Sequence, residues 1–384
     1  MSDQLHEGAR PSANYRPELD GLRAIAITFV LLFHCLAVPA SGSTVWLHRA
    51  VSVMWSGVDI FFVLSGFLIT GILLDTRNEP NRWMNFIARR TLRVFPLYYL
   101  WLVIVFWVLP RFLETSLSPP NAEPWCWTYT FNCYIWVKNT FPEPVTINHF
   151  WSLAVEEQFY LVWPIIVFAL PSRLIGTVCL LGICSSIALK TYLYFGSSIH
   201  GMALYTATPL RADALLGGGF VAWLIRHPSA AKTKSVYRLI VVAGVLALLL
   251  LFRLRGFQNL VTFDKFTVCF LTSFFALTVP TLLQVLIENP NSVLVRVLSW
   301  KGFRPIAKIS YGLYISHYIV FILLVTSHKS QMVRVASQFG IPAWVVLFVF
   351  TVLISGIIST VLYLLVERPV LKLKRHFPYR QSST

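Results

Sequence analysis

The sequence predicts an all-α, polytopic membrane protein with about ten transmembrane helices and both termini in the cytoplasm. Of its 384 residues, 56% are hydrophobic and only 12% are charged, whereas soluble globular domains average roughly 45–50% and 25%. The apolar residues occur in continuous runs of about 20, the length that a helix needs to cross a bilayer. These runs lack the alternation of a membrane β-barrel, so helices are expected.

Ten runs are candidate spans: 20–39, 51–74, 94–110, 149–170, 174–195, 207–225, 239–252, 266–287, 309–326 and 342–366. The span 239–252 is short, and the spans 149–170 and 207–225 carry several polar residues, so their ends are the least defined. Residues 1–19 and 367–384 are then cytoplasmic tails, and residues 20–366 form one transmembrane domain.

The distribution of basic residues sets the orientation. With ten spans, 22 of the 32 Lys and Arg residues fall on the side of the termini, and cytoplasmic loops are the ones enriched in these residues. The net charge of +16 is therefore explained mostly by topology. It predicts contact with membrane lipids and gives no reason to expect a nucleic-acid partner.

Charged side chains inside spans are candidate functional residues, because each costs about 2.5–3.5 kcal/mol near the centre of the membrane. The predicted topology places one imidazole, several carboxylates and one guanidinium in the outer third: His34, Asp59, Glu156, Glu157, Arg211 and Asp213. Arg211 and Asp213 are close in sequence, and mutual neutralisation is an equally good reading of that pair.

The inner face is basic. Arg90 and Arg93 open the third span, and Arg23 lies at the same level on the first. Arg23 and His34 are eleven residues apart, which leaves them about 20° apart around a helix and about 16 Å apart along it. Guanidinium groups bind phosphate, and an imidazole can remove a proton from a hydroxyl. Arginines beside a span are also common topology signals, and a lone membrane histidine can be a packing hydrogen bonder.

Other motifs narrow the chemistry. The sequence has no residue set with the spacing of a metal site, so no metal is expected. Gly217, Gly219 and Ala222 match a dinucleotide fingerprint, but inside a span and without a preceding strand they predict close helix packing. Cys126 and Cys133 fall in the long outer loop 111–148, where a disulfide and two free thiols are equally compatible with the sequence.

Several sequence blocks, in this order and spacing, resemble the acyltransferase-3 family of integral membrane acyltransferases. The blocks are Arg16-Pro-Glu-Leu-Asp-Gly-Leu-Arg23-Ala24 running into His34, Gly57-Val-Asp59-Ile-Phe-Phe-Val-Leu-Ser-Gly-Phe67, Arg89-Arg90 with Arg93 and Pro96, Trp151-Ser-Leu-Ala-Val-Glu156-Glu157-Gln-Phe-Tyr160, Arg211-Ala-Asp213, Ile309-Ser-Tyr311-Gly-Leu-Tyr314 with His317, and Glu367-Arg-Pro369.

The resemblance implies a ten-helix enzyme of the bacterial inner membrane. Such an enzyme takes an acyl group, usually acetyl, from cytoplasmic acyl-CoA and places it on a hydroxyl of an extracytoplasmic or lipid-linked glycan. Acetyl-CoA is then a co-substrate, and no permanently bound cofactor is expected. Arg23 and His34 match the family's Arg, ten residues, His signature, and Arg90 and Arg93 match its donor-binding arginines.

Combined with the predicted depths, the resemblance assigns a role to each candidate. His34 acts as general base or carries the acyl group transiently, with Glu156 as its orienting carboxylate and Asp59 as the alternative. Arg23, Arg90 and Arg93 hold the CoA phosphates, and Tyr311 and His317, expected nearer the cytoplasmic half, line the donor channel. A second acid/base is the lesser alternative for His317. Four residues are expected on the acceptor side: Glu157, Arg211, Asp213 and Trp151. A transporter or flippase of a sugar-containing substrate is the alternative function.

Overall fold

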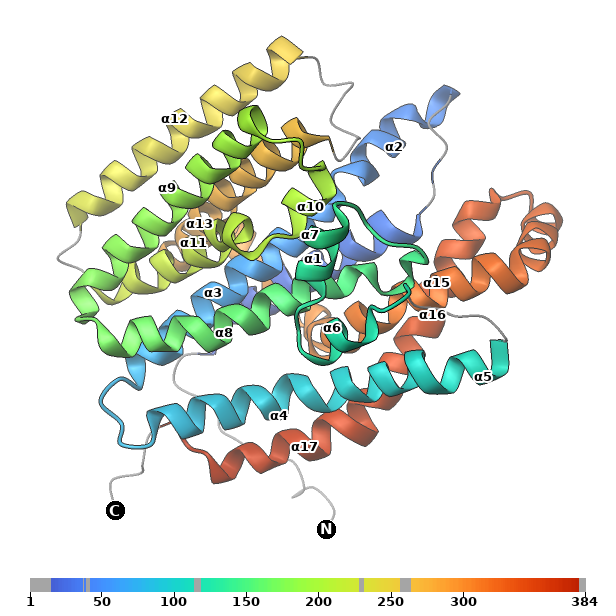
Figure 1. Ribbon diagram of the computed structural model, residues 1–384, viewed down its shortest axis with the longest axis horizontal. Coiled ribbons are helices and arrows are strands. Elements are labelled where there is room, and N and C mark those ends of the chain that lie inside the picture. Colours follow the sequence, from blue (N-terminus) through green and yellow to red (C-terminus); the bar gives the residue numbers. More distant parts are fainter. Residues whose placement is uncertain are drawn as a thin grey trace.

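Helices make up the fold, shown in Figure 1 as a computed structural model. The structure describes residues 15–36, 38, 42–113, 119–227, 231–255 and 264–379, and these contain no strand. The long helices are α1 (Pro17–Cys35), α3 (Gly57–Asp75), α4 (Arg82–Val103), α8 (Trp151–Ala169), α9 (Ser172–Gly196), α11 (Thr208–Arg226), α12 (Ala231–Arg255), α13 (Thr272–Glu288), α15 (Phe303–Phe339) and α16 (Ala343–Leu362). The short ones are α2 (Val45–Ser52), α5 (Leu109–Leu113), α6 (Glu123–Trp127), α7 (Phe131–Lys138), α10 (Gly201–Thr206), α14 (Val293–Leu298) and α17 (Arg368–Lys372).

Local sequence explains the start of α1. Pro17 takes the first helical position, where its missing N–H costs nothing. Glu18 and Asp20 lie in the first turn, where carboxylates interact favourably with the helix dipole. These acidic residues make the N-terminal end of α1 polar.

Helix α3 lies at the centre, in contact with α1, α8, α11 and α13. Its approach to α11 depends on glycine. A Cβ added at Gly66 would lie 1.8 Å from the Leu215 carbonyl oxygen, and one at Gly218 would lie 1.9 Å from that of Val63. The two backbones are therefore in direct contact, which only small residues allow. The glycine run 217–219 packs helices, as predicted, and Gly217 fits against Pro280 of α13.

Within the described residues, seven helical segments are long and apolar enough to cross a membrane, and they overlap seven predicted spans. They are Gly42–Asp75, Arg82–Leu113, Thr146–Ala169, Ser172–Gly196, Thr267–Glu288, Phe303–Phe339 and Ala343–His376. The other three predicted spans, 20–39, 207–225 and 239–252, correspond to α1, α11 and α12. Helices α1 and α11 carry several charged side chains each, so ten crossings remain a prediction for them and for α12.

The two described ends of the chain meet. Asp20 and Arg23 of α1 line the same cavity as Lys374 and Tyr379. Ends that lie together are on the same side of the bundle, as an even number of crossings requires; the number of crossings and the side of the membrane stay predictions. At the periphery, α12 runs along one edge and α4 with α17 along the opposite edge (Figure 1).

Candidate functional site

Three neighbouring cavities contain most of the predicted site residues. We name them the basic vestibule (about 340 Å³), the central cavity (about 140 Å³) and the histidine pocket (about 190 Å³). Arg23, Arg90 and Arg93 line both the vestibule and the central cavity. Val58 and Tyr314 line both the central cavity and the histidine pocket. The cavities therefore form a series that begins at arginines and ends at His34.

The basic vestibule is lined by six cationic side chains and one carboxylate: Arg23, Arg89, Arg90, Arg93, Lys308, Lys374 and Asp20. Two of the arginines have acidic neighbours. Arg23 Nη1 lies 3.8 Å from Asp20 Oδ1, and Arg93 Nη1 lies 3.7 Å from Glu367 Oε2. Arg90 forms no ion pair with the described residues, and its Nε has no hydrogen-bond partner among them. The vestibule is thus suited to an anion.

The central cavity adds carboxylates and hydroxyls to the three arginines and to several apolar side chains. Glu156 Oε2 accepts a hydrogen bond of 3.3 Å from Tyr160 Oη, which also contacts Ser65 Oγ. Glu157 lines the same cavity, as does Tyr311, whose hydroxyl donates to the Val94 carbonyl oxygen at 3.0 Å. Glu156 therefore borders the same cavity as Arg23, Arg90 and Arg93.

Two imidazoles line the histidine pocket, those of His34 (α1) and His149 (the 3₁₀ turn Val145–Phe150). The buried imidazole of His317 (α15) packs against both of them. The three ring centroids lie 5.1–6.4 Å apart. His317 Nδ1 lies 3.0 and 2.8 Å from the carbonyl oxygens of Leu313 and Tyr314. Because carbonyl oxygens only accept, Nδ1 of a neutral His317 carries the proton and its Nε2 is an acceptor.

This tautomer determines that of His34. The His34 Nδ1 atom lies 3.3 Å from His317 Nε2 and 3.1 Å from the Val30 carbonyl oxygen. Both neighbours are acceptors, so Nδ1 of His34 is the donor and its Nε2 is the unprotonated nitrogen. An unprotonated Nε2 on a ring held by its other nitrogen can take a proton or attack an electrophile.

The predicted orienting carboxylates do not contact His34. Glu156 hydrogen-bonds to Tyr160 in the central cavity, and Asp59 pairs with Arg211. The hydrogen-bond partners of His34 within the described chain are the Val30 carbonyl and His317. The sequence predicts Glu156 and Asp59 at the same depth in the membrane as His34. The depth of a residue does not determine which face of its helix is turned toward His34.

His317 also lies elsewhere than expected. The sequence placed it nearer the cytoplasmic half, beside the donor channel, whereas it contacts His34 at 3.3 Å. The contact follows from the packing of α1 against α15, which position along a single span does not determine.

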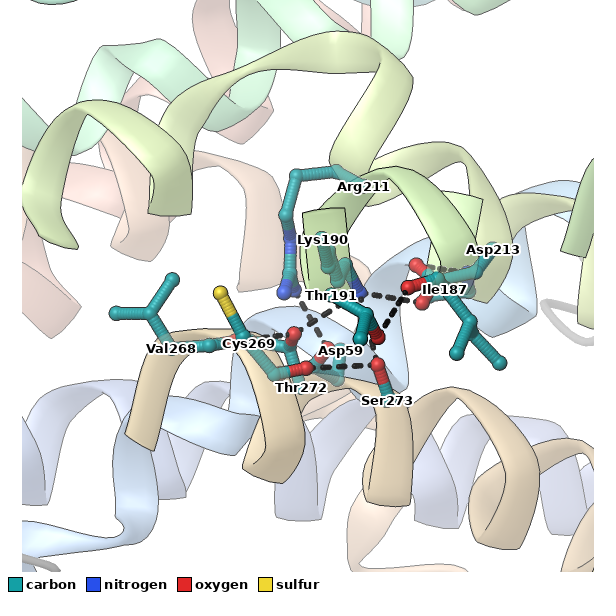
Figure 2. Close-up of polar contacts among 11 residues, drawn as sticks. Asp59, Ile187, Lys190, Thr191, Arg211, Asp213, Val268, Cys269, Thr272 and Ser273 are labelled. Carbon is teal, nitrogen blue, oxygen red and sulfur yellow. Dashed lines mark hydrogen bonds and ion pairs between the residues drawn. The ribbon is translucent and has the colours of Figure 1, made fainter. Parts of the chain in front are cut away.

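Asp59, Arg211 and Asp213 belong to a buried charge cluster with Lys190 (Figure 2). Arg211 Nη2 lies 2.5 Å from Asp59 Oδ1, and Lys190 Nζ lies 2.5 Å from Asp213 Oδ2. Thr272 Oγ1 accepts a further hydrogen bond from Lys190 at 2.9 Å. Arg211 and Asp213 thus do not neutralise each other, and neither lies in the three cavities. Of the expected acceptor-side residues, only Trp151 lines the histidine pocket.

Two residues of these sites were missed from the sequence. His149 lies two positions before Trp151, and the spacing 149, 152, 156 places it near the face of Ser152 and Glu156. Lys190 lies inside the predicted span 174–195, where an intramembrane charge is itself a signal of a partner.

The two cysteines of the loop 111–148 are not bonded to each other: Cys126 is a buried free thiol and Cys133 an exposed one. Burial raises the pKa of the Cys126 thiol, so it is not a reactive nucleophile. Within the described residues, no group of three or more His, Cys, Asp or Glu side chains is placed to hold a metal ion.

Comparisons with known proteins agree with the sequence blocks. A family model described as an acyltransferase domain matches residues 16–360. The peptidoglycan O-acetyltransferase OatA of Listeria monocytogenes is 30% identical over 331 residues, which are 82% of this chain and 50% of that protein. The O-acetyltransferase OatA of Staphylococcus aureus is 28% identical, with 94% and 58% covered. The putative peptidoglycan O-acetyltransferase YrhL of Bacillus subtilis is 29% identical, with 93% and 55% covered. The chain therefore spans about half the length of these curated relatives. No solved structure matches it.

Proposed function

Because this chain belongs to the acyltransferase-3 family, we propose that it transfers an acetyl group from cytoplasmic acyl-CoA to a hydroxyl of an extracytoplasmic glycan. The observation that carries this proposal is the series of three cavities between the arginines and His34. A donor with a phosphorylated head and a long thioester arm fits such a series, because its two ends need different surroundings.

The donor's phosphates bind at Arg23, Arg90 and Arg93, which remain charged and can bind phosphate oxygens bidentately. Its pantetheine arm extends through the central cavity, past Tyr311 and Tyr314. The thioester then reaches the histidine pocket. Holding the donor at both ends converts the transfer into an effectively intramolecular step.

In the transfer step, His34 Nε2 removes the proton from the acceptor hydroxyl as the oxygen attacks the thioester carbonyl. The carbon–sulfur bond breaks when the tetrahedral intermediate collapses, and the proton passes from His34 to the sulfur, so CoA leaves as the thiol. His317 keeps the Nδ1 proton of His34 in place and thereby leaves Nε2 available. In the other route, Nε2 attacks the thioester carbonyl, the carbon–sulfur bond breaks and CoA leaves as the thiolate. The acceptor hydroxyl then takes the acetyl group from Nε2, and its proton neutralises the thiolate.

The acceptor is proposed to be a glycan of the cell envelope. Two curated relatives are named as peptidoglycan O-acetyltransferases, and the histidine pocket has aromatic walls that can stack on a sugar ring. These walls are formed by Phe33, Trp55, Phe141, Trp151, Tyr205, Tyr314 and Tyr318. The proposed location is the bacterial inner membrane.

The experiment is acetyl transfer by the purified protein in proteoliposomes, with acetyl-labelled acetyl-CoA on one side and peptidoglycan fragments on the other. Label on the glycan, dependent on the protein, is the expected result. Movement of a substrate across the membrane without acetyl transfer would instead indicate a transporter or flippase. Protein-bound label in the absence of acceptor would identify the acetyl-histidine route.

A further inference from the structure

We propose that the C-terminal segment Leu373–Tyr379, here named the terminal strap, completes the binding site for the nucleotide head of acyl-CoA. This inference rests on the proposed function and deepens it. The strap lies beyond residue 360, where the family match ends. From the sequence alone, the basic residues of this tail predict an anchor for the last helix.

Hydrogen bonds hold the strap against α4, almost 300 positions away in the chain. Arg89 Nη1 donates to the carbonyl oxygens of Lys374 (2.9 Å) and Phe377 (3.0 Å), and Asn85 Nδ2 donates to that of Pro378 (2.6 Å). The Arg89 guanidinium also lies 4.3 Å from the centre of the Tyr379 ring. Arg89 therefore fixes the strap beside the arginines that follow it on α4.

The strap adds a cation and an aromatic ring to the basic vestibule. Lys374 and Tyr379 line this cavity together with Arg23, Arg90 and Arg93. Its six cationic side chains face the Asp20 carboxylate, with Glu367 beside Arg93 as a second acid. Such an excess of positive charge is compensated by an anionic ligand, and Arg90 Nε has no partner within the described chain.

The aromatic lining favours a nucleotide over a simple phosphate. Tyr363 and Tyr379 both line the vestibule, and nucleic-acid bases stack on aromatic rings regardless of their sequence. A volume of about 340 Å³ falls in the range of small-ligand sites. A phospholipid head group could also supply phosphate to these cations, but it has no base to stack.

Binding of adenosine 3′,5′-bisphosphate tests the strap directly, because this compound lacks the thioester and needs no turnover. The full chain is reconstituted in zwitterionic nanodiscs and titrated by calorimetry. We expect Lys374→Gln to weaken binding about tenfold, the effect of losing one charge-assisted hydrogen bond. Tyr379→Ala weakens it as well, whereas Tyr379→Phe, which keeps the ring, binds like the unchanged protein.

Lys372→Gln is the matched control, because Lys372 lies on α17 with an exposed side chain and does not line the vestibule. Equal affinities of Lys374→Gln and Lys372→Gln would overturn the role of the strap. If these variants also bind CoA like the unchanged protein, the proposed donor site remains supported, but the strap contributes nothing to it. If the unchanged protein binds neither CoA nor the bisphosphate, the proposed function fails.

Two further experiments distinguish a nucleotide ligand from a phospholipid head group. Nanodiscs that contain anionic lipid should leave bisphosphate binding intact, and loss of binding there would identify the vestibule as a lipid site and overturn the proposal. In the acetyl-transfer assay, Lys374→Gln should raise KM for acetyl-CoA and leave KM for S-acetyl-4′-phosphopantetheine unchanged. An equal rise for both donors would contradict a contact with the nucleotide.

Discussion

The buried charge cluster and the cavity series contain the same kinds of residue but use them differently. In the cluster, each charge has an oppositely charged partner, Asp59 with Arg211 and Asp213 with Lys190. In the cavities, Arg90 lacks an ion pair with any described residue and His34 hydrogen-bonds to another histidine. The difference teaches that an intramembrane charge alone does not mark an active site. The informative feature is an ionisable group that faces a cavity without a compensating charge.

The largest expected effect tests the cavity side of this comparison. His34→Ala should lower kcat for acetyl transfer by about 10²–10⁴-fold, the usual contribution of a general base. The melting temperature should change little, because the ring borders a cavity. Turnover and thermal unfolding are measured on the same preparation. His328→Ala, at an exposed position of α15, is the control, and full activity of His34→Ala would refute the mechanism.

A substitution in the buried charge cluster should lower stability, in contrast to one at His34, which should lower activity. Lys190→Met leaves Asp213 buried without its partner and should destabilise the protein by about 3–5 kcal/mol. Thermal unfolding in detergent measures this loss. The double variant Lys190→Met with Asp213→Asn should recover much of the stability, because no unpaired charge remains there. An unchanged melting temperature for Lys190→Met would mean that the cluster is not structural.

A smaller effect is expected from the residue that holds His34. His317→Leu removes the acceptor for His34 Nδ1–H and should lower kcat about 10–100-fold, as loss of an orienting partner commonly does. His317→Gln offers an amide oxygen near the position of Nε2 and should restore most of the rate. KM for acetyl-CoA should stay constant in both variants. Equal rates for the Leu and Gln variants would contradict the tautomer assignment.

The smallest effect concerns the outer loop, where buried and exposed thiols are compared. Cys133→Ser should change stability by less than about 0.5 kcal/mol, since it alters an exposed side chain. A reductant should not shift the melting temperature. Maleimide should label Cys133 in the folded protein and Cys126 only after unfolding. A reductant-dependent melting temperature would show that the two cysteines form a disulfide.

The helices could be predicted from the sequence because apolar runs of span length leave few alternatives in a membrane. Seven of the ten predicted spans were confirmed as helices of sufficient length and hydropathy. The helix ends were less predictable. The apolar run of α15 starts near residue 309, whereas the helix itself begins at Phe303, because backbone hydrogen bonding continues past the apolar residues.

The partners of the site residues could not be predicted. Depth in the membrane follows from position along a span, but contact also requires the rotation and packing of each helix. Glu156 and Asp59 lie on other helices than His34, so nothing in the local sequence determines which side chain meets the imidazole. The contact between His317 and His34 depends on the packing of α1 against α15, which the sequence does not reveal. By contrast, Arg90 and Arg93 lie one helical turn apart on α4, so the sequence alone predicts that they share a face.

Helix α15 borders all three cavities. Lys308 lines the basic vestibule, Tyr311 the central cavity, and Tyr314 and Tyr318 the histidine pocket. From Lys308 to Tyr318 the helix rises about 15 Å, and no loop interrupts it. The separation between the proposed phosphate-binding end and the proposed reacting end is therefore rigid, and it fixes the length of donor that can reach both. A compact acyl donor such as acetyl phosphate cannot touch both ends at once. The site would therefore select acyl donors by the length of the carrier as well as by its charge.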